Sequence, residues 1–449
     1  MWWKPLVHVC QRWRQLIFAS PRSLRLTVVC NPRTPVRKLL NIWPPFPISV
    51  HHSARDRGGE DENTITMLKL RDRVAEISIN SQMGSVLGRF TAEMLESFPA
   101  LVSLSLGYGG DMAPAPVLPA SLLGGSAPSL QTILLSGIAF PALPTLLSST
   151  AQLTSLQLWK TPITGYISPE AMATCLGQLP NLEDLRIGFN SPHEDPRPPF
   201  PTRFILPSLT SFRFEGASEY SESLLARIDA PILQTLSITF CDIILHIPQL
   251  YHFISCAKSP ESPSRVIMGF DYWRVELKFI PSNDLELIIG CENLTGHLSS
   301  MAVVCRDLSP LLSRVERLDF RGDRGPWFPV WLDGIGFPTE LDWLGLFSPF
   351  VTVQSLCVSK ELVPNIACAL DGLVKERATA VFPKLRSLFL EELQPSGSVR
   401  SAVEAFVATR WFSDHPVTFQ QRLPLDSDTR ITLSPFSWPA WYWDPTSDD

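Results

Sequence analysis

The chain has 449 residues, of which 45% are hydrophobic and 18% charged, so it can bury a large core and does not have the composition of a disordered protein. Its net charge of −6 argues against nucleic acid as the main partner, because a general nucleic-acid binder normally carries a basic surplus. Apolar runs are too short to span a membrane, and charges interrupt the first apolar stretch, which excludes a secretory signal.

An amphipathic helix over residues 2–17 is the first element that the sequence predicts. Its apolar residues recur at the spacing of one helix face, whereas Arg12 and Arg14 fall elsewhere. This apolar face comprises Leu6, Val9, Cys10, Trp13, Leu16 and Ile17. We expect the helix to cap the open end of the first repeat, with Trp13 largely buried beside Val9 and Leu16. If the helix instead awaits a partner, Trp13 or Leu6 should lie partly exposed.

Residues 21–72 are interpreted as a linker and N-terminal cap that lead into a repeat domain over residues 73–434. Within the linker, the charged and glycine-containing segment 55–63 predicts a surface loop. The tail, residues 435–449, holds three tryptophans and a tyrosine before an acidic end. We expect it to fold onto the last repeats as an aromatic cap, with binding to a partner as the alternative.

A short phrase recurs through the repeat domain, in which the last six residues read apolar-x-x-apolar-x-apolar, often with a proline two positions before them. Copies stand at 99–106, 128–135, 151–158, 180–187, 207–214, 231–238, 313–320, 351–358 and 383–390. Successive copies among the first six lie 23–29 residues apart, which is the period of leucine-rich repeats. Because alternate residues are apolar, one face of each strand is buried, and parallel stacking joins these faces into one core.

The predicted fold is therefore an α/β leucine-rich-repeat solenoid, with parallel strands on one face and helices or irregular segments on the other. Parallel neighbouring strands are expected at 103–106, 132–135, 155–158, 184–187, 211–214 and 235–238. Apolar segments at 142–149 and 169–178 suit the returning layer, and we expect the prolines to stop the preceding helices. The alternative is an ordinary α/β protein in which the leucine clusters are coincidental.

The pattern lapses in an irregular region over residues 241–313. Its segments 266–270, 274–279 and 284–290 read as strands by alternation and β-branching, but they do not fit the phrase. An irregular or inserted sheet is expected there.

Leu6 to Ile17 resembles the last helix of the F-box, a family whose Val-Cys-x-x-Trp core matches Val9, Cys10 and Trp13. The segments 18–30, 34–48 and 315–322 resemble fungal F-box proteins with degenerate leucine-rich repeats, so that the similarity covers most of the chain. Residues 1–20 would then form a partial F-box, because the Leu-Pro phrase and the two earlier helices of the family do not precede them.

In that family the F-box docks on the Skp-type adaptor of a cullin ubiquitin ligase, and the repeats capture the protein to be ubiquitinated. The resemblance implies a non-enzymatic substrate receptor of an SCF-type (Skp–cullin–F-box) ligase, active in the cytoplasm or nucleus without a cofactor. The residues expected to bind the adaptor are Leu6, Val9, Cys10, Trp13, Leu16 and Ile17. One alternative is a repeat scaffold that has lost ligase assembly, and another is an unrecognised hydrolase that uses the irregular region.

The target-binding surface is expected on the solvated face of the strands, because the third, fifth and seventh residues of each phrase point away from the core. Trp159, Arg186 and Arg213 stand out there, since Trp and Arg dominate interface hot spots. Arg186 and Arg213 should be lateral neighbours, which favours an acidic or phosphorylated ligand. The alternative is two solvated arginines held by Asp184 and Glu215.

A second basic pair, Arg317 and Arg321, flanks Asp319 in a later copy and would extend this surface.

The nine cysteines are odd in number and include no Cys-x-x-Cys pair, which indicates buried thiols in a reducing compartment. Cys241, His246, His252 and Cys256 are ligand types that zinc accepts, but their spacing matches no common zinc module. We therefore predict no metal site. The sequence also lacks a nucleophile elbow and a phosphate-binding loop, so no residue is assigned a catalytic role.

Overall fold

The computed structural model describes residues 5–18, 26–30, 36–42, 46–53, 62–110, 114–189, 203–244, 246–257, 264–270, 274–280, 286–291, 297–322, 340–374, 381–391 and 397–422. These form two compact units. The first comprises Met1–Thr235 and His252–Lys258, and the second comprises Leu236–Tyr251 and Ser259–Asp449. Most of the predicted loop at 55–63 and the whole tail at 435–449 lie outside the described residues.

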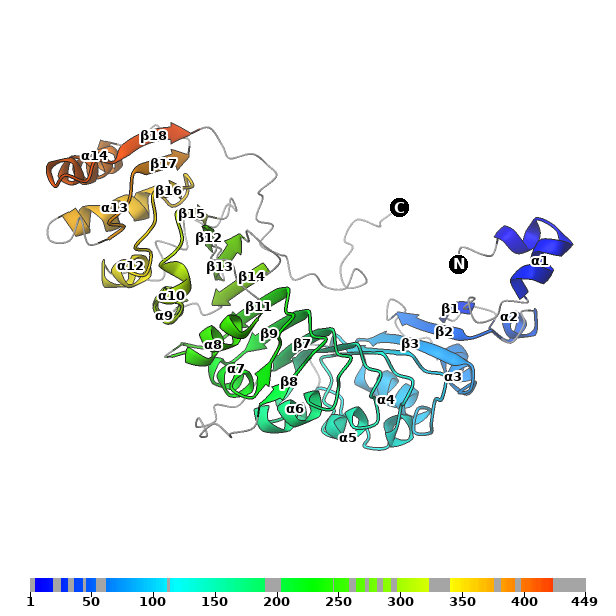
Figure 1. Cartoon of the computed structure of the whole chain (residues 1–449). Helices are drawn as coiled ribbons and strands as arrows, with labels where there is room; N and C mark the ends of the chain where they lie inside the picture. Colours follow the sequence, from blue (N-terminus) through cyan, green and yellow to red (C-terminus); the bar gives the residue numbers. More distant parts are fainter. Residues whose placement is uncertain are drawn as a thin grey trace. The chain divides into compact units, whose positions relative to one another are not determined.

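The first unit is built on parallel strands that are neighbours in chain order (Figure 1). In order they are β1 (Leu26–Cys30), β2 (Ile48–Ser53), β3 (Val74–Ser81), β4 (Ser103–Tyr108), β5 (Thr132–Ser136), β6 (Ser155–Thr161), β7 (Asp184–Phe189) and β9 (Ser211–Gly216). Every pair from β1 to β9 in this order is parallel. A small parallel pair, β8 (Phe204–Ile205) and β10 (Ile228–Asp229), lies apart from this sheet.

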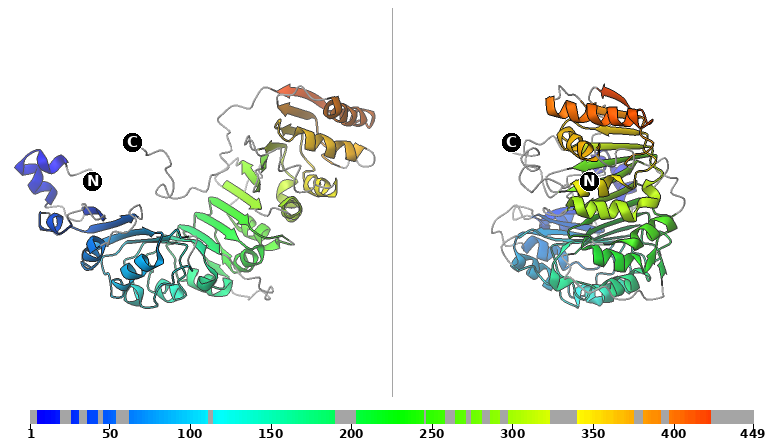
Figure 2. Two further views of the ribbon diagram at one scale, coloured as in Figure 1. Left: turned by 180° about the vertical axis from the view of Figure 1, so that it is seen from behind. Right: turned by 90° about the vertical axis from the view of Figure 1, so that its left-hand side faces the viewer.

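Two helices, η1 (Pro5–His8) and α1 (Gln11–Phe18), precede the first strand. The other helices of the first unit lie between strands in the chain, and α3 to α7 line one side of the sheet (Figure 2). They are α2 (Val36–Ile42), α3 (Glu62–Leu68), α4 (Gly84–Ala92), η3 (Leu122–Gly125), α5 (Leu143–Leu147), η4 (Ile163–Gly165), α6 (Pro169–Leu176) and α7 (Ser218–Leu225). α5 and α6 fall on the two apolar segments that were predicted for the returning layer.

The repeated phrase explains the core of this unit. Its second and third apolar residues alternate along each strand and face the helices, as Leu156 and Leu158 of β6 do at 0% and 2% exposure. Its first apolar residue is buried just before the strand, as Leu153 is. The predicted strands from β4 to β9 are therefore confirmed as parallel neighbours.

A tight turn precedes β4, β5, β6, β7 and β9, and it gives the prolines a more specific role than stopping a helix. The backbone N–H of Leu182 donates to the carbonyl of Leu179 at 3.2 Å, which places Pro180 at the second position of a four-residue turn. The same bond closes the turns that contain Pro99, Pro128 and Pro207. Proline suits this position because its ring fixes the backbone angle that the turn needs.

The second unit contains the remaining strands, in the spatial order β11, β14, β13, β12, β15, β16, β17 and β18. Their bounds are β11 (Thr235–Phe240), β12 (Arg265–Phe270), β13 (Val275–Ile280), β14 (Glu286–Cys291), β15 (Arg317–Gly322), β16 (Ser355–Val358), β17 (Ser387–Glu391) and β18 (Thr418–Arg422). The strands from β15 to β18 are parallel neighbours, and β12 also pairs parallel to β15. Its helices are α9 (His297–Asp307), α10 (Ser309–Leu312), α12 (Glu340–Phe347), α13 (Val363–Val374) and α14 (Gly397–Phe412), while α8 (Pro248–Cys256) carries residues of both units.

The irregular region 241–313 contains an antiparallel meander, in which β12 pairs with β13 and β13 with β14. All three predicted strands of the region are present. The strands of both units have the arrangement of a leucine-rich-repeat solenoid, and the meander is a departure from it. Two parallel strands, β1 and β2, lie within the predicted linker and cap at 21–72, whereas the predicted domain boundaries stay predictions.

Candidate protein-binding surfaces

The solvated face of the strands in the first unit carries the residues that the phrase predicts. Ser155, Gln157 and Trp159 are partly exposed on β6, between the buried Leu156 and Leu158. On β7 and β9 the same positions hold Asp184, Arg186, Ser211, Arg213 and Glu215, all partly exposed. On the neighbouring β4 and β5 the same positions hold mostly small or hydroxyl residues, so Trp159, Arg186 and Arg213 stand out beside them.

Asp184 organises that area by accepting two hydrogen bonds and forming one ion pair. The amide nitrogen of Gln157 donates to Oδ2 of Asp184 at 2.8 Å, and the Ser155 hydroxyl donates to the same oxygen at 3.2 Å. Nε of Arg186 lies 3.5 Å from Oδ1, and its guanidinium carbon lies 6.0 Å from the centre of the Trp159 ring. The charge of Arg186 is therefore offset by Asp184, and its planar group lies against an aromatic surface.

Arg186 and Arg213 are paired in register on β7 and β9, as expected from the phrase. Two positive charges thus lie side by side, and Asp184 and Glu215 belong to the same two strands. The four charges sum to zero. This matches the alternative in which acidic neighbours hold the arginines, and Trp159, Arg186 and Arg213 stay predicted target-binding residues.

The second unit carries a denser charged cluster on its open face. Arg317, Asp319 and Arg321 share one face of β15, because Leu318 and Phe320 between them are buried on the helix side. Nε of Arg317 donates to Oδ1 of Asp319 at 2.9 Å, and Nη2 of Arg321 lies 3.7 Å from Oδ2.

A third arginine, Arg265, completes this cluster from β12, where it is the register partner of Arg317. Its Nε donates to Oδ2 of Asp319 at 2.9 Å, and its Nη2 also contacts this oxygen. We call Arg265, Arg317, Arg321 and Asp319 the arginine cluster. The phrase search missed Arg265, because Pro263 stands where the phrase has its first apolar residue.

Asp319 is ionised within the arginine cluster. Burial would raise the pKa of its carboxyl group, but hydrogen bonds from Arg317 and Arg265 outweigh burial, and the pKa lies below its ordinary value. Burial lowers the pKa of Arg321, with Asp319 opposing the change, yet an arginine remains charged near neutrality. Three cations therefore surround one buried anion.

Other charges on this open face nearly balance. Nη2 of Arg274 lies 2.9 Å from Oε2 of Glu276, and both side chains are largely buried. Lys278 of β13 and Glu391 of β17 are partly exposed, and the carboxylate of Glu391 acts on Arg321. Among the side chains that the structure describes on this face, cations outnumber carboxylates, and the arginine cluster contains three of these cations.

The N-terminal helix differs from the sequence prediction in shape and burial. Pro5–His8 forms a 3₁₀ turn and the α-helix begins only at Gln11, so the apolar residues do not share one continuous helical face. Val9, Trp13 and Leu16 are 62%, 46% and 61% exposed, so the expectation of a buried cap is wrong.

The remaining residues of the predicted adaptor-binding face show the same tendency. Leu6 and Ile17 are partly exposed and Cys10 is exposed. Phe18, one residue beyond the predicted segment, contacts Phe46 with ring centres 5.6 Å apart. The helix therefore presents apolar surface to solvent, which is the arrangement expected if it awaits a partner.

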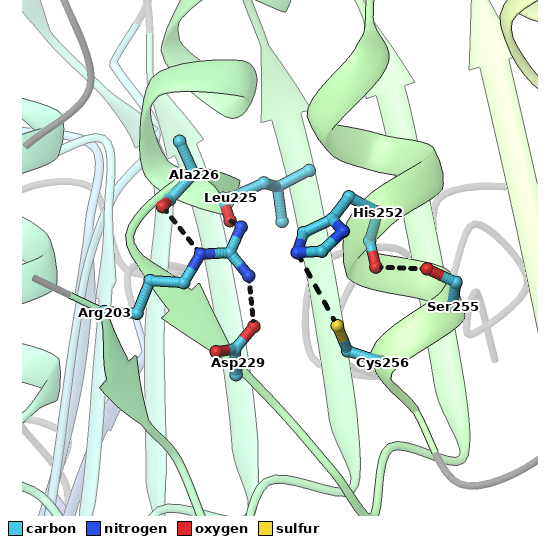
Figure 3. A network of polar contacts seen from close by, with 7 residues as sticks. All are labelled: Arg203, Leu225, Ala226, Asp229, His252, Ser255 and Cys256. Atoms are coloured by element: carbon cyan, nitrogen blue, oxygen red, sulfur yellow. Dashed lines mark hydrogen bonds and ion pairs between the residues drawn. The ribbon is translucent and has the colours of Figure 1, made fainter. Parts of the chain in front are cut away.

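Two polar contacts of the first unit lie beside α7 and α8 (Figure 3). Arg203 donates to the carbonyls of Leu225 and Ala226 at the end of α7 and to Asp229 at 2.6 Å, so it satisfies backbone groups that the helix leaves open. Nε2 of His252 lies 3.8 Å from Sγ of Cys256, one helical turn away. We read both contacts as structural.

The possible metal ligands are not brought together. His246 contacts Asp307 at 2.8 Å, whereas His252 contacts Cys256. Within the described ranges, no three histidine, cysteine, aspartate or glutamate side chains are grouped as a metal site needs.

A hydrolase in the irregular region would need a nucleophile beside a histidine that a carboxylate orients. His246 and Asp307 would supply the histidine and the carboxylate of such an arrangement. In the described part of the chain, Asp307 is the only hydrogen-bonding partner of the His246 ring. Among the described residues, none therefore hydrogen-bonds to this histidine as a nucleophile would.

Among the cysteines whose side chains the structure describes, none forms a disulfide, and Cys30, Cys175, Cys291, Cys305 and Cys357 are buried. Cys10, Cys241 and Cys256 are exposed, contrary to the expectation of buried thiols. Burial raises the pKa of the Cys175 and Cys291 thiols, so both are neutral at physiological pH.

No protein-family model matches the chain, and no curated protein is similar to it. Among solved structures, the leucine-rich repeat-containing protein LegL7 from Legionella pneumophila aligns with 85% of this chain and 97% of its own, at 12% identity and a TM-score of 0.27. Among the described helices, none is long and apolar enough to cross a membrane.

Proposed function

We propose that this chain is a non-enzymatic protein-interaction module that binds a partner protein along the open face of its strands. The observation that carries the proposal is the alternation along β6, β7 and β9, where every second side chain leaves the core and faces solvent. A face of small and hydroxyl residues, with Trp159 and Arg186 held in contact, suits a binding surface that has a few energetic anchors.

The test is a comparison of two double variants that remove the same charge. Arg186→Ala/Arg213→Ala alters the open face, whereas Lys69→Ala/Arg89→Ala removes two exposed cations from the helix side of the same unit. Proximity labelling should lose partners in the first variant and keep them in the second. Equal partner lists and affinities for wild type and both variants would show that the open face of this unit is not the recognition surface.

We further propose, from the F-box resemblance, that α1 docks on a Skp-type adaptor and that the chain is the substrate receptor of an SCF-type ligase in the cytoplasm or nucleus. The exposed apolar side chains of Val9, Trp13 and Leu16 support a docking role, because exposed apolar groups in proximity mark interaction sites. The alternative remains a repeat scaffold without ligase assembly.

Adaptor docking is tested by titrating the purified chain with a Skp-type adaptor. Trp13→Ala should abolish binding and lower the free energy of unfolding by no more than about 0.5–1 kcal/mol, since Trp13 is nearly half exposed. Trp411→Ala, at a more exposed tryptophan of α14, is the matched control and should bind like wild type. If the wild-type chain does not bind the adaptor, the scaffold alternative stands.

A further inference from the structure

The arginine cluster keeps a positive excess, unlike the balanced group of Asp184, Arg186, Arg213 and Glu215 on the open face of the first unit. Three guanidinium groups surround one buried carboxylate, and the carboxylate of Glu391 acts on Arg321, so the described charges of this place remain positive in a chain whose net charge is −6. Building on the proposed protein-binding function, we propose that Arg265, Arg317 and Arg321 bind a phosphate monoester carried by the partner protein.

The geometry sets the three guanidinium groups around one place. Arg265 and Arg317 are register partners on adjacent parallel strands, which lie about 4.8 Å apart. Arg321 lies on the same face of β15, beyond Asp319. Contacts to Asp319 fix all three side chains, so that little rotamer entropy is lost when a ligand binds.

The side chains of the arginine cluster differ in their exposure to solvent. The Asp319 side chain is only 1% exposed, whereas those of Arg265, Arg317 and Arg321 are 23%, 31% and 17% exposed. A partner that approaches the open face therefore meets guanidinium N–H groups and not the carboxylate. Guanidinium groups match the geometry of phosphate oxygens, with which they form paired hydrogen bonds.

Charge distinguishes a phosphate from a carboxylate as the preferred ligand. A phosphate monoester carries a charge of about −1.5 to −2 near neutral pH, whereas a carboxylate carries one negative charge. Three guanidinium groups therefore attract the phosphate more strongly, and it offers them more acceptor oxygens.

The strands beside the arginines leave room and offer further donors. The register partner of Arg317 on β16 is Ser355, and the next in line on β17 is Ser387. Both serines are partly exposed and are small, and their hydroxyl groups can donate to an anion.

The same reasoning does not place a phosphate on the first unit. Arg186 and Arg213 are accompanied by Asp184 and Glu215 on the same strands, and these four charges cancel. Arg400→Gln provides the matched control, because it removes one arginine of α14 that is paired with Glu404 and belongs to neither proposed binding surface.

The first experiment titrates the full-length chain calorimetrically with phenyl phosphate and with benzoate, its carboxylate counterpart. Phenyl phosphate should bind at least about tenfold more tightly, and Arg317→Gln should weaken it about tenfold to hundredfold, as expected for a lost charge-assisted hydrogen bond. Arg317→Lys should restore part of the affinity, and Arg400→Gln should bind like wild type. Circular dichroism establishes that each variant is folded. Equal affinity for the two probes, or no loss in folded Arg317→Gln, overturns the site.

The second experiment identifies what carries the phosphate. Partners captured by wild type from extracts should be lost after phosphatase treatment of the extract, and lost in Arg317→Gln. If phosphatase leaves capture unchanged while phenyl phosphate still binds, the partner half of the proposal is overturned, and tight binding of inositol hexakisphosphate would assign the site to a free phosphate compound.

These outcomes separate this inference from the proposed function. If capture of a partner depends on Arg186 and Arg213 but not on phosphate, the proposed interaction module is supported and the proposed phosphate-bearing partner is refuted. If neither open face captures a partner, the proposed interaction module is refuted. The phenyl phosphate titration then tests phosphate binding by the arginine cluster separately.

Discussion

Asp319 is a carboxylate in the interior that is stable only because arginines surround it. Taking a carboxylate out of water is costly, and the hydrogen bonds from Arg265 and Arg317 offset that cost. The residue occupies a position on the open face where most repeats carry a solvated side chain. Its burial is therefore a consequence of its neighbours and not of the repeat.

Replacing Asp319 by asparagine should lower the free energy of unfolding by about 3 kcal/mol at neutral pH, because the partly buried arginines lose their counter-charge. The difference from wild type should also depend on pH. The pKa of Asp319 is depressed in the folded chain, so its contribution is complete above the ordinary aspartate value of about 3.9 and is lost as pH falls through the folded pKa. Urea unfolding between pH 7 and pH 2 measures this, and a constant difference would contradict it.

Gly137 is a second residue whose local geometry decides its identity. It has a φ of +68°, in the left-handed region, and an added Cβ would clash with the carbonyl oxygen of Tyr108. Gly137→Ala should cost at least about 1–2 kcal/mol. Gly88→Ala in α4 is the control, because nothing lies near its Cβ position and alanine favours a helix. Thermal unfolding should rank the variants as Gly88→Ala, wild type and Gly137→Ala, and the reverse order would refute this account.

At the scale of elements, the turns before the strands form their own ladder along the first unit. The residue after the turn proline donates a side-chain hydrogen bond to the carbonyl of the turn in the preceding repeat. Ser129 donates to Pro99 at 3.0 Å, and Ser208 donates to Pro180 at 2.8 Å. Each turn is thus fixed by its own backbone bond and by its neighbour.

One turn lacks the proline, and this allows a prediction. Ala151 takes the position of Pro180 in a turn closed by the bond from Leu153 to Thr150 at 3.0 Å, and it accepts from Asn181 as Pro180 does from Ser208. Ala151→Pro should raise the free energy of unfolding by about 0.4–1 kcal/mol, because proline restricts the unfolded chain. Pro180→Ala should lower it by a similar amount. Chemical denaturation of both variants tests this, and destabilisation by Ala151→Pro would show that the two turns differ.

The elements differ in how far the sequence predicts them. The phrase predicts β4 to β9 because each copy buries its own leucines against the next, so the information is local. The meander β12–β13–β14 reads correctly as three strands, but the pairing of β12 with β15 spans about 50 residues and has no local signature. Arg265 escaped prediction both because Pro263 interrupts the phrase and because the pairing that sets it beside Arg317 is long-range.

The N-terminal helix shows the opposite failure. A regular apolar spacing over residues 2–17 assumes one continuous helix, and the 3₁₀ turn at Pro5–His8 breaks that assumption. The prediction that Trp13 is buried depended on this continuous helix, and both predictions are wrong.

At the scale of the whole molecule, both units are stacks in which a strand pairs only with the strands beside it. Stability in such a stack is approximately a sum of repeat terms and nearest-neighbour terms. A repeat with an imperfect phrase therefore lowers the stability of that repeat and of its two contacts with adjacent repeats, and the rest of the stack is unaffected.

This locality leads to a prediction for hydrogen exchange. Leu156→Ala in β6 removes a fully buried side chain and should cost about 2–5 kcal/mol. Exchange of backbone amides should then accelerate most in β5, β6 and β7 and progressively less toward β3 and β2, because destabilisation passes only through adjacent repeats. Leu388→Ala in β17 should act in the same way on β16 and β18 of the second unit. Ser105→Ala, on the open face of β4, is the control and should leave the exchange pattern unchanged. Equal acceleration in every strand of the mutated unit would instead show that the unit unfolds as a single cooperative body.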